Sequence, residues 1–193
     1  MYRCLIANRG EIAVRIIRAC RELNIETVAI YAKGDETSLH VSLADQAICI
    51  GEANPLDSYL NIDRIISAAK VTESNAIHPG YGFLSESTNF AKAVEDNHIH
   101  FIGPSKTTME MMGDKITARQ TVKQAGVPVI PGSNDAVQSV DEIKLLAKEI
   151  GFPVVLKAAS GGGGKGIRIV KEASQLDQAL KEAKSEGQKY FND

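Results

Sequence analysis

The sequence predicts an α/β protein in which a parallel sheet with helices on both faces is followed by a small α+β unit. Three observations lead to this fold class. Short apolar runs alternate with helical patterns through the first half of the 193-residue chain, and strands separated by helices favour parallel pairing through right-handed crossovers. The rhythm changes after residue 103. Near the end, two strand-like runs enclose a glycine-rich stretch. The length suits one large or two small domains.

The first half contains candidate strands and helices in alternation. Strands are expected at residues 4–7, 27–31, 47–50, 76–77 and 100–103, where apolar residues gather. A helix is expected from Glu11, because Ile12, Ile16, Cys20 and Leu23 recur at helical spacing. Two further helices are expected at residues 60–71 and 86–96, the second of them with Ser85 as its cap.

The second half has a different pattern. Residues 106–125 read as one long or two short helices, ended by Gly126 and Pro128. Residues 129–134 hold two Pro/Gly breakers and are expected to connect two domains. A helix at 141–150, strands at 152–156 and 167–170, and a helix from 173 to about 190 should follow. A single β-pair backed by helices is too small a sheet to stand alone.

Composition excludes several classes of function. With 22 basic and 24 acidic residues the net charge is −2, so nothing favours nucleic acid or an acidic membrane surface as a partner. The chain lacks an apolar run of about 18 residues, and its first residues do not have the pattern of a signal peptide, so we expect neither a membrane span nor a secretory signal. The three cysteines lie in apolar runs and are expected to be buried thiols in a reducing cytosol, so we expect a cytoplasmic location. The histidines show no metal-ligand spacing, and no metal site is expected.

The stretch from Lys157 to Gly166 is the most informative part of the chain. Its glycines leave the unfolded chain freer, and five of them together could cost about 2–5 kcal/mol of stability. A need for bare backbone N–H groups close to an anion, with Lys157 and Lys165 adding positive charge, explains that cost best. A P-loop fits poorly, because Gly166 stands where Ser or Thr should hold the metal and the chain continues as a strand. A flexible linker is the other alternative, although linkers are seldom enclosed by apolar strands.

Two other segments and two lysines could contact a ligand, but each could also have a purely structural role. Residues 8–11 follow the first strand, but one glycine does not make a dinucleotide fingerprint, and a strand-to-helix turn is favoured. Residues 78–86 follow another strand, at the edge where open α/β sheets bind ligands, yet a structural turn with a packed Tyr81 stays open. Lys115 is either a phosphate contact or a solvated lysine. Lys157 ends an apolar run and is expected to face inward or toward a ligand.

Six motifs occur in order along nearly the whole chain. They are IANRGEIA at 6–13, SYLN at 58–61, AIHPGYGFLSE at 76–86, FIGP at 101–104, MGDK at 112–115 and KAASGGGGKG at 157–166. Together they resemble the amino-terminal part of the biotin carboxylase family, the ATP-dependent component of acetyl-CoA carboxylase in fatty acid biosynthesis and of related carboxylases.

The resemblance implies a fold and a chemistry. Residues 1–113 would form the pre-ATP-grasp domain, and residues 114–193 would begin the ATP-grasp domain with a glycine-rich lid. The family uses ATP and Mg²⁺ to convert bicarbonate to carboxyphosphate, and the carboxyl group passes to biotin on a biotin carboxyl carrier protein that also serves a carboxyltransferase. By position, Lys115, Lys157, Gly163 and Gly164 match nucleotide contacts of this ligase. Tyr81, Gly82 and Glu86 would lie near the reaction centre, and a homodimer could form through the helix of Arg18 and Glu22.

The resemblance also implies that much of the enzyme is missing here. Complete members continue for more than the present length again, and that region carries the Mg²⁺ ligands, the bicarbonate contacts and the arginine at biotin. The site at which biotin is attached is absent too. We therefore expect the 193-residue chain alone not to turn over ATP, because metal ions are central to phosphoryl transfer.

Two rival functions remain open from the sequence. One is a non-catalytic nucleotide-binding or dimerisation module, which the missing acids favour and the intact glycine stretch disfavours. The other is a different ATP-grasp ligase, such as carbamoyl-phosphate synthase or a purine-pathway carboxylase. The segment at 78–86 fits the biotin carboxylase family better.

Overall fold

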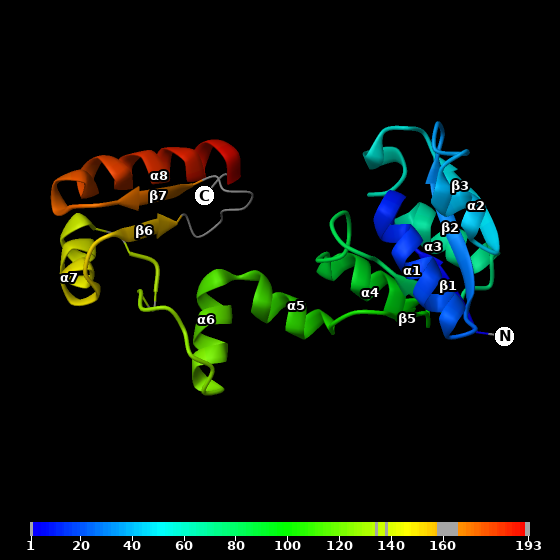
Figure 1. The fold of residues 1–193 in the computed structure, drawn as a ribbon, viewed down its shortest axis with the longest axis horizontal. Coiled ribbons are helices and arrows are strands. Elements are labelled where there is room, and N and C mark those ends of the chain that lie inside the picture. The colour runs from blue at the N-terminus through cyan, green and yellow to red at the C-terminus, as the bar shows by residue number, and fades with distance from the viewer. Residues whose placement is uncertain (1, 134, 138, 158–165, 192–193) are drawn as a thin grey trace. The chain divides into compact units, whose positions relative to one another are not determined.

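The chain folds as two compact units, Met1–Glu110 and Met111–Asp193. The computed structural model describes residues 2–133, 135–137, 139–157 and 166–191 (Figure 1).

The first unit is built on a parallel sheet of five strands in the order β3-β2-β1-β4-β5 (Figure 1). Helix-containing crossover connections join the successive strands, as parallel pairing requires. This confirms the α/β class expected from the alternating apolar runs. The strands are β1 Arg3–Ile6, β2 Glu26–Ala32, β3 Gln46–Gly51, β4 Ala76–His78 and β5 His100–Phe101.

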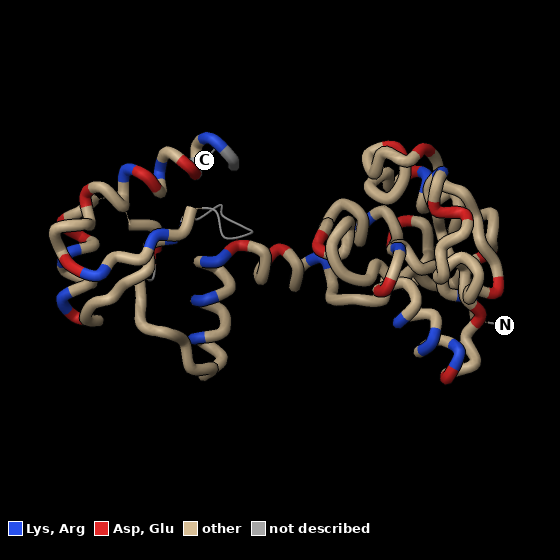
Figure 2. The backbone as a smooth tube through the Cα atoms, turned by 45° about the horizontal axis from the view of Figure 1, so that its top comes forward, with Lys and Arg blue, Asp and Glu red and all other residues tan. Residues whose placement is uncertain are grey.

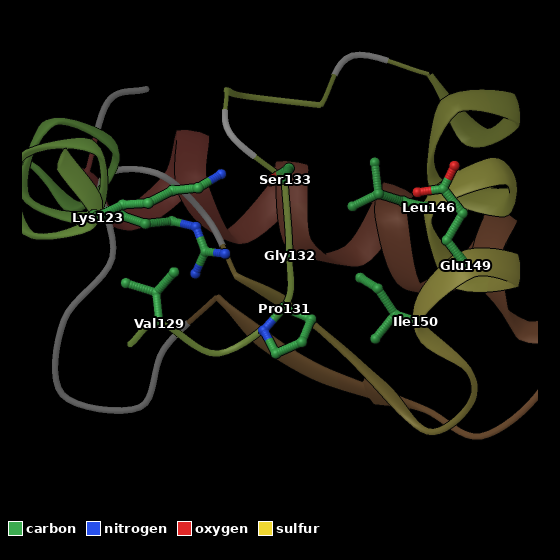
Figure 3. A pocket seen from close by; sticks show the side chains of 9 residues that line it. Lys123, Val129, Pro131, Gly132, Ser133, Leu146, Glu149 and Ile150 are labelled. Atoms are coloured by element: carbon green, nitrogen blue, oxygen red, sulfur yellow. The ribbon is translucent and has the colours of Figure 1, made fainter. Parts of the chain in front are cut away.

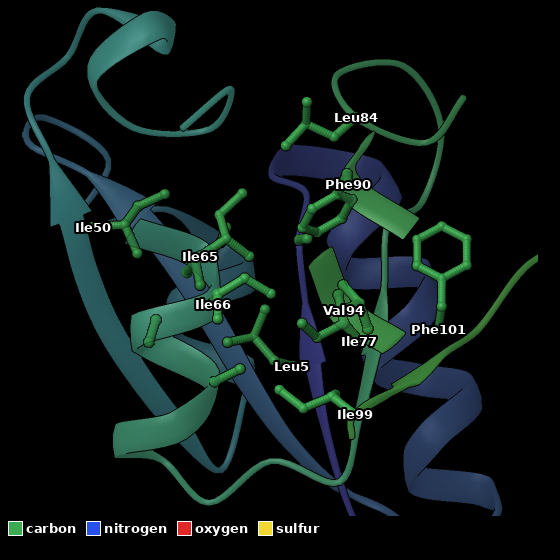
Figure 4. Close-up of a cluster of buried hydrophobic side chains, with 14 of the residues drawn as sticks. Leu5, Ile50, Ile65, Ile66, Ile77, Leu84, Phe90, Val94, Ile99 and Phe101 are labelled. Carbon is green, nitrogen blue, oxygen red and sulfur yellow. The ribbon is translucent and has the colours of Figure 1, made fainter. Parts of the chain in front are cut away.

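Helices cover both faces of this sheet. On one face, α1 (Gly10–Glu22) packs on Cys4 and Ile6, with residues of α2 (Leu39–Leu43) at the margin of the same core. On the other face, α3 (Ile62–Val71) and α4 (Thr88–Asp96) pack on Leu5 and Ile77 (Figure 4). Alternate strand residues therefore supply two separate cores, because successive side chains of a strand point to opposite faces.

Several boundaries differ from those expected. Helix α3 begins at Ile62, where the Asn61 side chain accepts from the backbone N–H of Arg64. Helix α4 begins at Thr88 rather than at residue 86, and its cap is Ser87 and not Ser85. The Ser85 N–H instead closes a turn onto the Gly82 carbonyl oxygen. The short helix α2 and the 3₁₀ turn Pro55–Asp57 (η1) were not expected at all.

The second unit contains an antiparallel hairpin of β6 (Val154–Lys157) and β7 (Ile167–Val170). Its core joins this hairpin to α7 (Val140–Ile150) and α8 (Leu176–Phe191), through Ile143, Val170, Leu176 and Ala179. The expected helical stretch at 106–125 is two helices, α5 (Lys106–Gly113) and α6 (Lys115–Gln124). They separate at Asp114, whose carboxylate caps α6 by accepting from the Thr117 N–H at 2.7 Å. A 3₁₀ turn, η2 (Ala173–Gln175), precedes α8.

Charged residues of both signs are interspersed along both units (Figure 2). None of the described helices is long and apolar enough to span a membrane. Cys4 and Cys20 are buried as expected, but Cys49 is exposed, because it lies on the edge strand β3, which is covered on one side only. Leu23 is also exposed, since α1 ends at Glu22.

Candidate functional site

A tight turn follows β4 at the carboxyl edge of the parallel sheet. Three of its residues have positive φ: Gly80 at 67°, Gly82 at 68° and Phe83 at 45°. Glycine adopts this region at little cost, whereas a phenylalanine there is strained and must be held by its surroundings. The turn is therefore determined by tertiary contacts as well as by its glycines.

Asn8, in the loop that follows the neighbouring strand β1, holds this turn. The side chain is buried, and its Nδ2 donates to the carbonyl oxygens of Pro79 and Tyr81, both at 2.8 Å. Its Oδ1 accepts from the Arg9 N–H at 2.9 Å. A Cβ atom on Gly80 would lie 2.7 Å from Asn8 Nδ2, so a side chain at position 80 would displace this amide.

Arg9, the next residue, takes part in a second group of side-chain contacts. Its guanidinium donates through Nε to Asp35 Oδ2 at 2.8 Å and through its terminal nitrogen to Oδ1 at 2.5 Å. The Tyr59 hydroxyl donates to the same Oδ2 at 2.6 Å, and the guanidinium lies 5.7 Å from the centre of the Tyr59 ring. The Tyr59 ring in turn stacks on Phe83 with centroids 5.2 Å apart. Loops after β1, β2, β3 and β4 are thus joined side chain to side chain.

The charges of this group are mutually stabilised. The bidentate contact with Arg9 is the main cause that lowers the pKa of Asp35 below its ordinary value, and the Tyr59 hydroxyl adds to it. Burial, followed by the hydrogen bond to Asp35, raises the pKa of Tyr59 to about 12. At neutral pH the group therefore holds one carboxylate, one guanidinium and one neutral phenol.

Two of the four histidines in this unit have a ring nitrogen within hydrogen-bonding distance of a backbone atom. His78 Nδ1 accepts from the Gly80 N–H at 3.0 Å, and burial lowers its pKa. His40 is fully buried with Nε2 3.2 Å from the Ile30 carbonyl oxygen, and burial lowers its pKa as well. Both imidazoles are neutral at pH 7. Among the described residues, no group of three or more His, Cys, Asp or Glu side chains could hold a metal ion.

In the second unit, the two faces of the β6–β7 hairpin differ. Register pairs Val155 with Ile169 and Lys157 with Ile167, so these four side chains share one face. That face is exposed: Val155 by 49%, Ile167 by 39% and Ile169 by 67%. The opposite face, with Val154, Leu156 and Val170, packs into the core of the unit. The open face combines apolar surface with a lysine.

The strand that leaves the glycine-rich stretch is anchored to α8. The Gly166 N–H donates to Glu186 Oε2 at 2.8 Å, and Gly166 has a φ of 71°. Arg168, two residues on, pairs with the same Glu186 and with Glu182. The end of this stretch is therefore fixed by charge-assisted contacts.

The predicted site residues lie in both units. Tyr81 is 70% exposed, and Glu86 is exposed just before α4. Lys115 is exposed in the first turn of α6, and Arg119 and Lys123 follow at four-residue spacing, which places them along one side of the helix. Lys157 is exposed and does not face inward. Gly163 and Gly164 lie outside the described residues.

Sequence reasoning missed the contribution of Asn8, Arg9, Asp35 and Tyr59. The first two were interpreted as part of a strand-to-helix turn. They do form one, since Arg9 is the N-cap position of α1 and Glu11 lies in its first turn. Their side chains, however, reach loops 26 to 73 residues away in sequence, and no local pattern reports such contacts.

A pocket of about 560 Å³ lies in the second unit between α6, residues 129–133 and α7 (Figure 3). Arg119, Lys123, Glu149 and Ile150 are among its lining residues. Because its lining includes none of the predicted contacts, we assign no ligand to it.

Comparison with known proteins identifies similar sequences over the whole chain. The family model "Biotin carboxylase, N-terminal domain" matches residues 1–109, and "Carbamoyl-phosphate synthase L chain, ATP binding domain" matches residues 114–193. Biotin carboxylase 1 of Bacillus subtilis is 53% identical over 189 residues, which are 98% of this chain and 42% of that protein. The 2-oxoglutarate carboxylase small subunit of Hydrogenobacter thermophilus is 51% identical over 189 residues, with 98% and 40% covered.

Solved structures agree with these sequence matches. The biotin carboxylase of Campylobacter jejuni superposes with a TM-score of 0.89 at 49% identity, covering 99% of this chain and 43% of that one. The biotin carboxylase domain of the Hydrogenobacter thermophilus enzyme gives a TM-score of 0.85 at 50% identity, covering 98% and 42%. The chain thus spans about 42% of the length of these relatives.

Proposed function

Because the chain belongs to the biotin carboxylase family, we propose that it supplies the amino-terminal part of an ATP-dependent ligase that carboxylates carrier-bound biotin with bicarbonate. In this proposal residues 1–113 are the pre-ATP-grasp domain and residues 114–193 begin the ATP-grasp domain. The other ATP-grasp ligases are not favoured, since the relatives compared above are carboxylases or their biotin carboxylase components.

The main observation that supports the proposal is the exposed face of the β6–β7 hairpin. A nucleotide presents a flat, largely apolar base and a polyanionic tail, and binding sites combine apolar walls with a few placed polar groups. Val155, Ile167 and Ile169 offer the apolar wall, and Lys157 offers a cation on the same face. An exposed apolar face of this kind marks a surface that some ligand or partner covers.

Other parts of the proposed nucleotide site rest on sequence. Lys115 would contribute a second cation, and Gly163 and Gly164 would offer backbone N–H groups to phosphates. The Campylobacter jejuni relative was solved as a β,γ-ATP complex, and the Hydrogenobacter thermophilus domain with MgADP, ADP and bicarbonate. We propose ATP and Mg²⁺ as requirements here, with no Mg²⁺ ligand assigned to the described residues. Bound Mg²⁺ would neutralise phosphate charge.

In this proposal the first unit contributes residues near the site of carboxylation. We propose that Tyr81 and Glu86, both exposed at the carboxyl edge of the sheet, lie near the reaction centre. The position supports this, because open α/β sheets bind ligands outside the carboxyl ends of their strands.

The proposed partners follow from the same reaction. They are a biotin carboxyl carrier protein and a carboxyltransferase, and the setting would be the cytoplasm. A homodimer through α1 is part of the proposal, since Arg18 and Glu22 lie on its exposed side and the Hydrogenobacter thermophilus domain was solved as a dimer.

Calorimetric titration of this chain with ATP tests the nucleotide site. We expect saturable heat at millimolar ATP or below, and Lys157→Met should weaken binding by about tenfold, the factor for about 1.4 kcal/mol of lost charge contact. Lys148→Met, an exposed lysine on α7, is the matched control and should bind ATP like the parent chain. A chain that gives no heat at millimolar ATP would support a non-catalytic dimerisation module instead.

Phosphate release is the companion measurement. With bicarbonate, free biotin, ATP and Mg²⁺ present, we expect the isolated chain to bind nucleotide without releasing phosphate. Biotin-dependent release would show that the residues needed for turnover are all within this chain.

A further inference from the structure

We propose that Asp35 is a positioning residue, which holds the turn that presents Tyr81 by fixing Arg9 and Tyr59. This inference rests on the proposed function only for the role of Tyr81. The arrangement itself is a property of the first unit.

The first step of the argument is the number of donors that meet at one carboxylate. Asp35 accepts two hydrogen bonds from the Arg9 guanidinium and one from the Tyr59 hydroxyl. An exposed ion pair contributes little to stability, about 0–1 kcal/mol. Asp35 is different, because its side chain is only 16% exposed and its partners come from two other loops. The Asp35 carboxylate therefore connects its own loop to two others through three hydrogen bonds.

The second step is the placement of the Tyr59 ring. Tyr59 is buried, and its hydroxyl oxygen also accepts from the Ala32 N–H at 3.0 Å while donating to Asp35. Both hydrogen bonds fix the distal end of the ring. Phe83 stacks on this ring with an interplanar angle of 24°. The orientation of the ring thus depends on the carboxylate.

The third step is the strain at Phe83. This residue has a φ of 45°, which costs a bulky side chain free energy and persists only where surrounding contacts enforce it. The stack on Tyr59 is such a contact on one side of the turn. On the other side, Asn8 holds the carbonyl oxygens of Pro79 and Tyr81. The turn is therefore held by side chains from the loops after β1 and β3.

The consequence concerns Tyr81. Its carbonyl oxygen accepts a hydrogen bond from the buried Asn8 side-chain amide, whereas its own side chain is 70% exposed. A fixed backbone with an exposed aromatic side chain is a preorganised contact, which binds a ligand without first having to order itself. Asp35 contributes to this preorganisation from outside the contact surface.

Hydrogen exchange measured by mass spectrometry tests the inference on this chain without any nucleotide. In Asp35→Asn the carboxylate charge and one acceptor are lost. We expect exchange at residues 79–87 to accelerate by about tenfold to a hundredfold, the factor for losing a hydrogen bond to a charged group. Exchange in β1 and β2 should change much less. Tyr59→Phe should accelerate the same segment, and the double variant should add little to Asp35→Asn, because both act through one contact.

Asp45→Asn is the matched control. Like Asp35, Asp45 accepts from a hydroxyl and has a lowered pKa. Its donors are the hydroxyl and the backbone N–H of Thr27, and it lies away from the turn. It should leave residues 79–87 unchanged. Equal acceleration in the turn and in β1 and β2 would mean that Asp35 only adds global stability and would overturn the proposal, as would no acceleration at all. Since no ligand is used, a failed ATP titration and a failed exchange experiment are separate results.

Discussion

At the scale of single residues, buried polar side chains decide how the carboxyl edge of the first unit is built. Asn8 and His40 are nearly or fully inaccessible, and each has a hydrogen-bonding atom directed at a backbone carbonyl oxygen. A buried polar group left without a partner costs about 1–3 kcal/mol, so these residues should be sensitive to substitutions that preserve their shape.

Asn8→Asp is the sharpest substitution of this kind. It keeps the acceptor for the Arg9 N–H but replaces two donated hydrogen bonds with a carboxylate oxygen facing two carbonyl oxygens. We expect the free energy of unfolding from urea titration to fall by about 2–4 kcal/mol at pH 7. Asn75→Asp is the control. Asn75 is exposed and accepts from the Arg3 N–H, a role that aspartate retains, so its loss should stay within about 0.5 kcal/mol.

His40 should make stability depend on pH. Its pKa is lowered in the folded chain by burial, so below about pH 6.5 the unfolded chain binds a proton that the folded chain does not. The stability contributed by neutral His40 is therefore present above that pH and is lost as the pH falls, by at most about 1.4 kcal/mol per pH unit. Urea titrations between pH 7.5 and about 5 should show a shallower dependence in His40→Leu, although His78 keeps its own share. An identical slope in both proteins would contradict this assignment.

At the scale of elements, the turn after β4 determines how Tyr81 is presented. It joins a buried strand to a helix whose cap, Ser87, accepts from the Phe90 N–H at 3.2 Å. Two of its glycines have almost the same φ but different surroundings. They can therefore separate the cost of positive φ from the cost of a steric clash.

Gly80→Ala and Gly82→Ala form this matched pair. Both place alanine in the left-handed region, which costs about 1–2 kcal/mol. At Gly82 nothing lies within 4 Å of the added Cβ, whereas at Gly80 it meets Asn8 Nδ2 at 2.7 Å and Ile12 Cγ2 at 2.8 Å. We expect Gly80→Ala to lower the midpoint of thermal unfolding clearly further, as measured by circular dichroism. Equal losses would mean that Asn8 moves aside at no cost.

The sequence predicted elements better than their ends and their contacts. The strands, α1, α3 and α7 follow from apolar periodicity, which burial imposes directly. Helix α2 was missed because five residues are too short to show a period, and the start of α4 was misplaced because Ser85 and Ser87 are equally good caps by type. The glycine-rich stretch, Lys115 and Lys157 were assigned to a nucleotide site by motif, and that assignment stays a prediction. The pairing of Arg9 with Asp35 spans 26 residues and needed the fold.

At the scale of the whole molecule, each unit has its own core. The two clusters of the first unit lie wholly within residues 1–110, and together they cover both faces of its sheet. The core of the second unit is smaller and is built on a two-stranded hairpin. A domain with its own core can fold alone.

Residues 1–110 produced alone should therefore fold. We expect a cooperative urea transition by circular dichroism, with exchange protection in β1, β2 and β4 that matches the same peptides in the longer chain. A non-cooperative transition, or strands that exchange at once, would show that residues beyond 110 are needed to complete the first unit.

The exposure of Cys49 has a practical consequence for any study of self-association. Of the three thiols it alone lies at the surface, so it is the one that air oxidation or a maleimide would reach first. Protein stored without reductant would be expected to accumulate covalently linked pairs that run as dimers on a sizing column. A Cys49→Ser background, or a gel run with and without reducing agent, would keep such artefacts apart from a genuine two-fold assembly.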